Sequence, residues 1–302
     1  MEYGLISRSG DGRLRQREHQ EALYAAIKLK VSRLSPGRIV HPLPPWRPGD
    51  PSVLVFKDED VVRLAMEFRQ LREGLRASLP EDEVEGVGLP SLLLDEFALE
   101  VYGVSAEFNI LTANTTEMVK SLSGLMDHLT AVDFDELMAR EKAAGGSSAS
   151  KSVIYGTRYL LTFFAYYLLY HVCAGHDSGD TLKLLMTVAA IHPSVVGSEE
   201  LRFPIEVKKT LDQGNYVRFF SLRSEANPYQ RALLDTTVAR VRRQAMSSIS
   251  MAYHQFPLDD LTRILDFVSL TDCLEYLKTT AGIPKDSLDL KEYVVYFRKR
   301  RK

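Results

Sequence analysis

The residues best suited to chemistry lie close together in the middle of the chain, in the segment His171-Val-Cys-Ala-Gly-His-Asp177. Imidazole nitrogens, thiolates and carboxylates are zinc ligands, but a structural zinc site needs four of them in a tetrahedral array. Side chains crowded at one helix end do not easily close that array. A nucleophilic Cys173–His pair is the other reading, and nothing around it signals an activated thiol. We therefore favour a polar helix terminus and expect neither a metal nor a cofactor.

Sequence motifs for other reactions are not found. The chain has no Gly-rich lysine loop for phosphates, no Gly-x-Ser-x-Gly elbow and no His-Glu-x-x-His pair. Adjacent carboxylates such as Asp259-Asp260 are common on solvated faces. The sequence thus predicts a protein that is not an enzyme. A helical enzyme remains an alternative, which would require a polar pocket.

Basic residues predict a different kind of site, one for nucleic acid. The whole chain has a net charge of -2, but residues 291–302 hold six bases against one acid. Arg240 and Arg243 are three residues apart and would share a helix face. No aromatic residues interleave the basic run, so binding should be non-specific and salt-sensitive. A solubilising end or a nuclear-import signal is the alternative. The candidate residues are Arg240, Arg243, Lys278, Lys291, Arg298, Lys299, Arg300, Arg301 and Lys302.

The elements that would position these residues are mostly helices. The 302 residues are 45% hydrophobic and 26% charged, as in a globular protein. Apolar residues recur at a spacing of three or four, and the connections are short, which is typical of stacked helical hairpins. We assign these to 58–224, with an exposed Gly- and Ser-rich loop at about 141–151. The expected helices span about 58–79, 91–111, 115–129, 152–174, 178–191, 199–212 and 215–224.

Two further segments bear on the class of protein. Residues 1–57 are assigned to an irregular strap because six prolines fall between Pro36 and Pro51, although 14–34 could form a helix. The most apolar run, Leu160 to Cys173, has 14 residues, whereas a bilayer span needs about 20. It predicts a buried helix and no membrane insertion. No signal peptide is recognised, and two cysteines far apart fit a reducing compartment.

The region 225–297 predicts a winged helix. Pro228 and Pro257 enclose 28 residues without Gly or Pro, which indicates a long helix, and a short helix follows from Leu258. Ser269 is placed to cap a third helix that ends before Gly282. Aromatic and β-branched residues at 293–297 then predict a strand. Three helices followed by a strand is the order of a winged helix with a β-wing. Residues 298–302 form a basic tail. The fold class is therefore dominated by helices, with a small β-wing.

One segment resembles a known family. In Leu211-Asp-Gln-Gly-Asn-Tyr-Val-Arg-Phe-Phe220 a helix ends, Gly-Asn-Tyr turns the chain and Arg-Phe-Phe opens the next helix, which resembles the signature of the GANP family. The likeness covers about 60–297 and is most specific at 211–253. A Cys-Pro-x-Met-Cys-Pro-like segment usual in the family is not found, so the chain resembles a short, divergent member. The signature residues are Gly214, Asn215, Tyr216, Arg218, Phe219, Phe220, Asp235 and Tyr253, with Arg240 and Arg242 in the same pattern.

The resemblance implies a scaffold with a PCI-type domain. Such proteins pair with a second PCI-domain protein, which a small acidic subunit of the Sem/DSS type supports. The two winged helices then bind RNA or DNA together. The process implied is nuclear mRNA export coupled to transcription, or splicing in some branches, in the nucleus and at the nuclear pore. The alternative is a PCI subunit of a proteasome-lid, signalosome or translation-initiation type complex, which makes protein contacts only and works in the cytoplasm.

The same residues have a plain structural reading. Gly214 allows a positive φ between helices, and Asn215 can cap the helix that follows. Tyr216, Phe219 and Phe220 would fall on one face and pack into the core. Asp235 and Arg240 are expected to form structural salt bridges, since burial requires that charges be paired.

Overall fold

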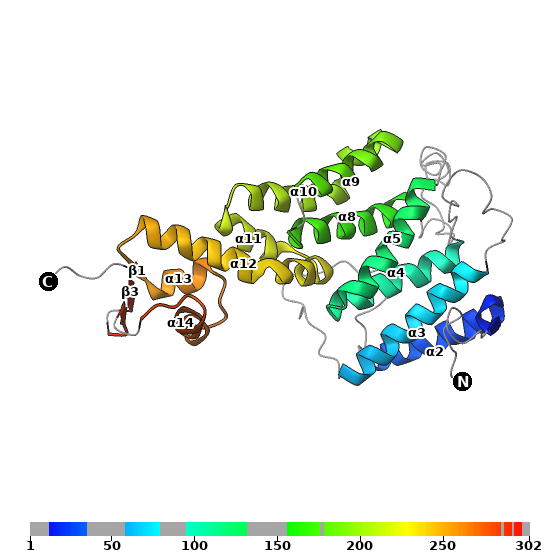
Figure 1. Cartoon of the computed structure of the whole chain (residues 1–302), viewed down its shortest axis with the longest axis horizontal. Coiled ribbons are helices and arrows are strands. Elements are labelled where there is room, and N and C mark those ends of the chain that lie inside the picture. The colour runs from blue at the N-terminus through cyan, green and yellow to red at the C-terminus, as the bar shows by residue number, and fades with distance from the viewer. Residues whose placement is uncertain are drawn as a thin grey trace, which may run out of the picture.

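The computed structural model describes residues 12–34, 58–78, 95–131, 156–175, 178–284, 287–291 and 293–297. These residues form an elongated molecule of packed helices with a small three-stranded sheet at one end (Figure 1). The helix-dominated fold with a small β-wing predicted from the sequence is confirmed. The predicted loop at about 141–151, the stretch from Pro36 to Pro51 and the tail 298–302 lie outside the described residues.

The N-terminal half of the array consists of helices stacked in chain order. A 3-10 turn, η1 (Gly12–Arg15), precedes α2 (Arg17–Leu34), which packs on α3 (Asp58–Ala77). Then α3 packs on α4 (Glu96–Leu111), and α4 on α5 (Thr115–Ala131). The helix that the sequence allows at 14–34 is thus present as α2, so the irregular strap assigned to 1–57 does not hold for residues 17–34. Apolar residues at helical spacing bury Leu23, Tyr24 and Ile27 there against the neighbouring helices.

The second half of the array surrounds α8 (Thr157–Cys173). This helix packs against α5, α9 (Ser178–Ile191), α10 (Glu199–Asp212) and the long helix α12 (Pro228–Ala252). Its apolar run is buried on nearly every side, as the sequence predicts for a core helix. None of the described helices combines the length and apolarity needed to cross a membrane. Along the chain, η3 (Pro193–Gly197) connects α9 to α10, and α11 (Tyr216–Glu225) connects α10 to α12.

Several helices begin at local capping signals. Asp95 caps α4 by accepting a hydrogen bond from the Ala98 backbone N–H at 2.8 Å, so α4 begins at Glu96, and the first residues of the helix predicted at about 91–111 lie outside the described residues. Asn227 and Gln230 form a reciprocal capping box at the start of α12. Similarly, Ser269 accepts from the backbone N–H of Asp272 and opens α14.

The C-terminal unit follows α12 in the order β1 (Gln255–Pro257), α13 (Leu258–Ile264), α14 (Leu270–Thr279), β2 (Leu288–Asp289) and β3 (Val294–Tyr296). The sheet order is β1-β3-β2, with both pairs antiparallel and the buried Val295 opposite Phe256 and Leu288. The sequence reading placed Phe256 on the long helix, which is wrong. The residue before a proline is biased towards extended backbone, and the helix ends at Ala252.

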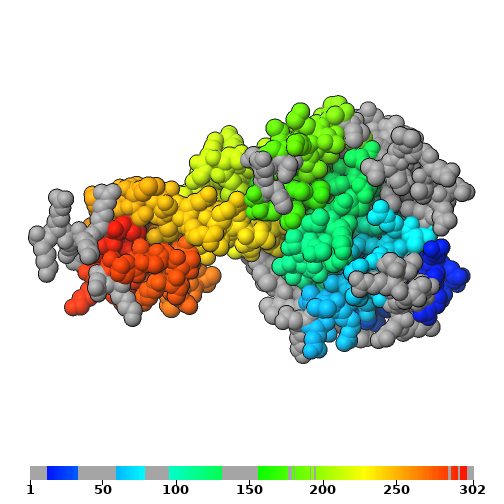
Figure 2. Space-filling model, viewed as in Figure 1, coloured from blue at the N-terminus to red at the C-terminus, as the bar shows by residue number. Residues whose placement is uncertain are grey.

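The space-filling view shows this terminal unit as a lobe that joins the array through a narrower part formed by α11 and α12 (Figure 2). We call this narrower part the joint, because contacts from α11 and α12 hold the lobe on the array there.

Two buried polar groups link helices inside the array. Arg72 of α3 donates to Ser105 of α4 and to Ser121 and Glu117 of α5. Glu107 of α4 is buried beside Tyr229 of α12, and burial raises the pKa of its carboxyl to about 8, against a hydrogen bond from Tyr229 that lowers it. Both groups are structural, because each is enclosed by helices of the core.

Candidate partner and nucleic-acid interface

The turn between α10 and α11 carries the Gly-Asn-Tyr segment. Gly214 has φ +63°, a conformation in which a side chain is strained. The Asn215 side chain accepts a hydrogen bond from the Arg218 backbone N–H at 3.0 Å and caps α11. Phe219 and Phe220 are buried and meet edge to face, with ring centroids 5.3 Å apart. These residues hold α11 against α12 and leave little of their surface for a ligand.

Arg223 connects three elements at the joint. Its Nε donates to Asp235 of α12 at 2.6 Å, and its Nη1 donates to Asp266, which follows α13. Burial alone would lower the pKa of Arg223, but the hydrogen bond and charge of Asp235, and then those of Asp266, raise it. The ion pair expected for Asp235 is therefore present, with Arg223 as its partner. This contact ties the terminal unit to the array.

Arg242 adds a second connection on the same side of α12. Its Nε and Nη2 donate to the backbone carbonyls of Leu265 and Asp266, at 2.9 Å and 2.6 Å. Its guanidinium also lies 3.9 Å from the centroid of the Phe267 ring, in a cation–π contact. The loop after α13 is thus held by two arginines from α11 and α12.

Arg240 points the other way, towards the array. It donates from Nε and Nη2 to the Thr237 hydroxyl, at 3.0 Å and 2.8 Å, and from Nη2 to the carbonyl of Cys173 at 3.2 Å. A cation at the last carbonyls of a helix is favourable, so Arg240 caps α8. The salt bridge expected for Arg240 is therefore wrong, since its partners are a hydroxyl and a carbonyl, not a carboxylate.

The other predicted phosphate contacts lie on the terminal unit. Arg243 is exposed on α12 and close to Tyr276 of α14: burial raises the pKa of that phenol, and the charges of Arg242 and Arg243 act against the rise. Lys278 is exposed in the last turn of α14, and Lys291 is exposed between β2 and β3. Arg240 does not lie with them, because it faces α8.

Charge on the terminal unit limits what it can bind. The exposed side of α14 carries Asp272 and Glu275 beside Lys278. Among the described residues from 253 to 297, acids outnumber bases two to one: Asp259, Asp260, Asp266, Asp272, Glu275 and Asp289 against Arg263, Lys278 and Lys291. Phosphate contacts would therefore come from a few cations and not from the whole face of α14.

The metal and nucleophile readings of the His171–Asp177 segment gain no geometric support. No group of three His, Cys, Asp or Glu side chains suited to a metal ion occurs in the part of the chain that the structure describes. His176 and Asp177 lie outside it. Burial raises the pKa of the Cys173 thiol to about 12, despite the opposing charge of Arg240, so the thiol is protonated at neutral pH.

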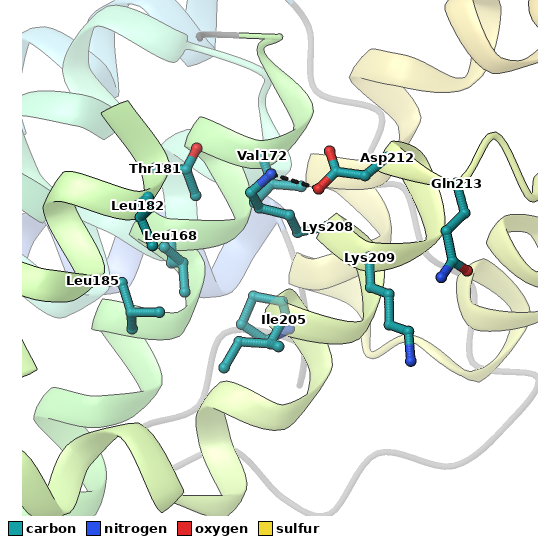
Figure 3. Close-up of a pocket in the computed structure, with 11 residues that line it drawn as sticks. Leu168, Val172, Thr181, Leu182, Leu185, Ile205, Lys208, Lys209, Asp212 and Gln213 are labelled. Atoms are coloured by element: carbon teal, nitrogen blue, oxygen red, sulfur yellow. Dashed lines mark hydrogen bonds and ion pairs between the residues drawn. The ribbon is translucent and has the colours of Figure 1, made fainter. Parts of the chain in front are cut away.

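A hollow that the sequence reading missed lies between α8, α9 and α10 (Figure 3). It has a volume of about 350 Å³ and a mainly apolar lining, with Lys208, Lys209 and Asp212 at one end. Lys208 Nζ lies 2.7 Å from Asp212 Oδ2. The spacing of residues along one helix does not signal the hollow, because its lining comes from three separate helices. The apolar lining is contributed by Leu168, Val172, Leu182, Leu185, Pro204 and Ile205.

These features define a helical-hairpin scaffold with a small helix–strand lobe at its end. Residues 152–283 match the SAC3/GANP family. The chain is also similar to SAC3 family protein A of Arabidopsis thaliana, with 29% identity over 142 residues. That alignment covers 42% of this chain and 14% of the relative, so the chain spans a small part of the relative's length. The resemblance recognised in the sequence is confirmed by these two matches, over the part of the chain that they cover.

Proposed function

We propose that the chain is a non-catalytic scaffold of a nuclear mRNA-export complex coupled to transcription. The observation that carries this proposal is the family match over 152–283, which includes the helices from α8 to α14. The match thus spans the central helix of the array, the Arg223 joint and most of the terminal lobe. A role in holding other molecules follows from that architecture more readily than a reaction does.

The domain organisation of the proposal has three parts and a tail. Residues 58–224 form the helical-hairpin array, with a loop at about 141–151, and 225–297 form a winged-helix subdomain. The order helix, strand, helix, helix, strand, strand, with the sheet order β1-β3-β2, supports this assignment. Residues 1–57 come before this part, with their helix α2 packed on α3, and 298–302 are the basic tail.

The terminal lobe is the proposed docking site for a second PCI-domain protein, itself supported by a small acidic Sem/DSS-type subunit. Large apolar side chains are exposed on this lobe, and Val268 is 99% exposed. Several exposed large apolar residues on so small a unit are typical of a protein interface. The residues are Tyr253, Val268, Leu290 and Tyr293, with Met251 at the adjoining end of α12.

RNA or DNA binding is proposed for the cations of the same lobe. Arg243, Lys278, Lys291 and the tail Arg298–Lys302 would contact phosphates without reading bases. The acids on α14 favour phosphate contacts without base reading. A helix that reads a groove lies between phosphates, which would repel these acids. The partner would supply the rest of the surface. Arg240 is left out of the proposal because its guanidinium caps α8.

The excess of acid on the lobe also supports the second candidate function. In that case the chain is a PCI subunit of a proteasome-lid, signalosome or translation-initiation type complex, makes only protein contacts and lies in the cytoplasm. The two functions differ in whether the assembled complex binds nucleic acid.

The experiment purifies the full chain with its partners from native cells and titrates the complex with fluorescein-labelled single-stranded RNA at several salt concentrations. Four or five phosphate contacts predict a slope of about -3 in log affinity against log salt. Deletion of 298–302 should flatten the slope, while Arg63→Ala on α3 should leave it unchanged. A complex without salt-dependent binding would favour the protein-only function.

A further inference from the structure

The outer surface of α9 carries apolar side chains that the core does not use. Leu182 is 54% exposed and Met186 is 61% exposed, and they are four residues apart on one side of the helix. The opposite side is buried through Val188. α9 lies at the edge of the array, where it packs on α8 and η3 (Figure 1). Exposed Leu and Met side by side on an edge helix indicate a surface that another molecule covers.

The neighbouring surface of α10 combines one apolar residue with two cations. Arg202, Ile205 and Lys209 are spaced by three and four residues, so they lie on one face. Ile205 is 38% exposed and lines the hollow together with Leu182 and Leu185 (Figure 3). Arg202 and Lys209 are exposed and have no ion pair among the described residues.

Asp212, the acid among the described residues that line the hollow, does not offset these cations. Asp212 is paired with Lys208 at 2.7 Å, as Figure 3 shows. Glu206, which is also on α10, accepts from Nε and Nη2 of Arg218 on α11. Among the described residues, the face of α10 beside the hollow therefore has an apolar centre flanked by two cations that make no ion pair, and the exposed Glu199 lies one turn before the first of them.

We propose that this surface binds an amphipathic helix of a partner protein that carries acidic residues seven positions apart and two apolar residues between them. Arg202 and Lys209 are seven residues apart, which is about 10 Å along a helix axis. Two turns of a partner helix have the same length. Acids at positions i and i+7 then meet the two cations, and apolar residues at i+3 and i+4 enter the hollow between Ile205 and Leu182.

Charge selects this occupant over two others. A basic helix would face two unpaired cations. A second copy of the chain, docked through the same surface by two-fold symmetry, would bring Arg202 and Lys209 against cations of the same kind. An acidic amphipathic helix satisfies both cations and covers the apolar residues. The proposal does not depend on the nucleic-acid role, because α9 and α10 lie away from β1 and β3 (Figure 1).

The test uses fluorescein-labelled helical peptides of about 18 residues, long enough for marginal helix formation in water. One peptide has Glu at i and i+7 and Leu at i+3 and i+4 in an Ala/Gln background, and a second has Lys in place of both Glu. Fluorescence anisotropy with the full chain should show saturable binding of the Glu peptide, roughly tenfold or more tighter than the Lys peptide, and weaker in high salt.

Three variants test the assignment to this surface. Arg202→Glu/Lys209→Glu should reverse the preference, so that the Lys peptide binds more tightly. Arg15→Glu/Arg63→Glu makes the same change in net charge at exposed positions on η1 and α3 and should keep the original preference. Ile205→Ala should weaken both peptides. Circular dichroism confirms that each variant is folded.

Three outcomes would overturn the proposal. The Glu peptide does not bind saturably, the two peptides bind wild type equally, or charge reversal at 202 and 209 leaves the preference unchanged. Sedimentation of the wild-type chain separates the remaining occupant: a concentration-dependent dimer that Ile205→Glu abolishes would assign this surface to self-association.

Discussion

Arg240 occupies the space that a side chain at position 175 would need. A Cβ built on Gly175 would lie 2.8 Å from Arg240 Nη1, and Gly175 has φ +70° at the end of α8. Because Gly175 has no side chain, the Arg240 guanidinium has room to reach the carbonyl of Cys173. The first arginine of the family-like Arg-x-Arg pattern thus contacts the array, whereas the second, Arg242, contacts the lobe.

Gly175→Ala should therefore destabilise the protein by about 1–2 kcal/mol, from backbone strain and displacement of Arg240. The melting temperature would fall by roughly 2–8 °C, measured by calorimetry or circular dichroism. Gly197→Ala is the matched control, since nothing lies within 4 Å of that position and its φ is not positive. If the displaced guanidinium contributes, Gly175→Ala should cost less in an Arg240→Ala background. Equal losses in both backgrounds would leave backbone strain as the sole cause.

A second prediction concerns the joint. Arg223→Met keeps much of the side-chain volume but removes the charge-assisted hydrogen bonds to Asp235 and Asp266. We expect a loss of about 1–3 kcal/mol and faster amide exchange in α13 and α14, because the loop after α13 loses an anchor. Arg218→Met is the control, as its ion pairs with Glu206 and Glu225 are exposed. Unchanged exchange in α13 and α14 would contradict the role given to Arg223.

The sequence predicts most helices because their signals are local. Asn215 and Ser269 cap their helices through neighbouring backbone N–H groups, and Gly214 and Gly282 have the positive φ that helix ends favour. The strand β1 could not be predicted in this way. It has three residues, and its pairing with β3 joins segments about forty residues apart in the chain, which leaves no periodic pattern to recognise.

The candidate site was harder to predict because it depends on which helix packs where. Arg240 and Arg243 are neighbours by spacing, but α8 lies on the side of Arg240 and α14 near Arg243. Spacing gives a position around one helix axis and says nothing about the neighbour it faces. The hollow between α9 and α10 has the same origin, since Leu182 and Ile205 meet only through the packing of separate helices.

A third prediction follows from the buried Glu107. Burial raises the pKa of this carboxyl from 4.5 to about 8. Between those pH values the folded protein keeps a proton that the unfolded chain releases, so this group makes the free energy of unfolding decrease as pH rises. The slope approaches 1.36 kcal/mol per pH unit for one proton. Glu107→Gln removes the titration and keeps an acceptor for Tyr229, so its stability relative to wild type should increase from pH 5 to pH 8. A constant difference across that range would mean that Glu107 is ionised in the folded protein.

The last prediction separates residues that hold the fold from residues that bind a partner. Phe219 is fully buried, and its replacement by Ala should cost about 3–5 kcal/mol and lower the melting temperature. Val268 is 99% exposed on the terminal lobe, so Val268→Asp should leave stability nearly unchanged. If the lobe is the docking site, Val268→Asp should reduce recovery of the partner when the full chain is purified from native cells. Val62→Asp provides the control, since Val62 is 68% exposed on α3, far from the lobe in the fold. Equal recovery of the partner with Val268→Asp and Val62→Asp would mean that the exposed apolar residues of the lobe are not the docking site. A lower melting temperature for Val268→Asp would instead show that Val268 is needed for folding.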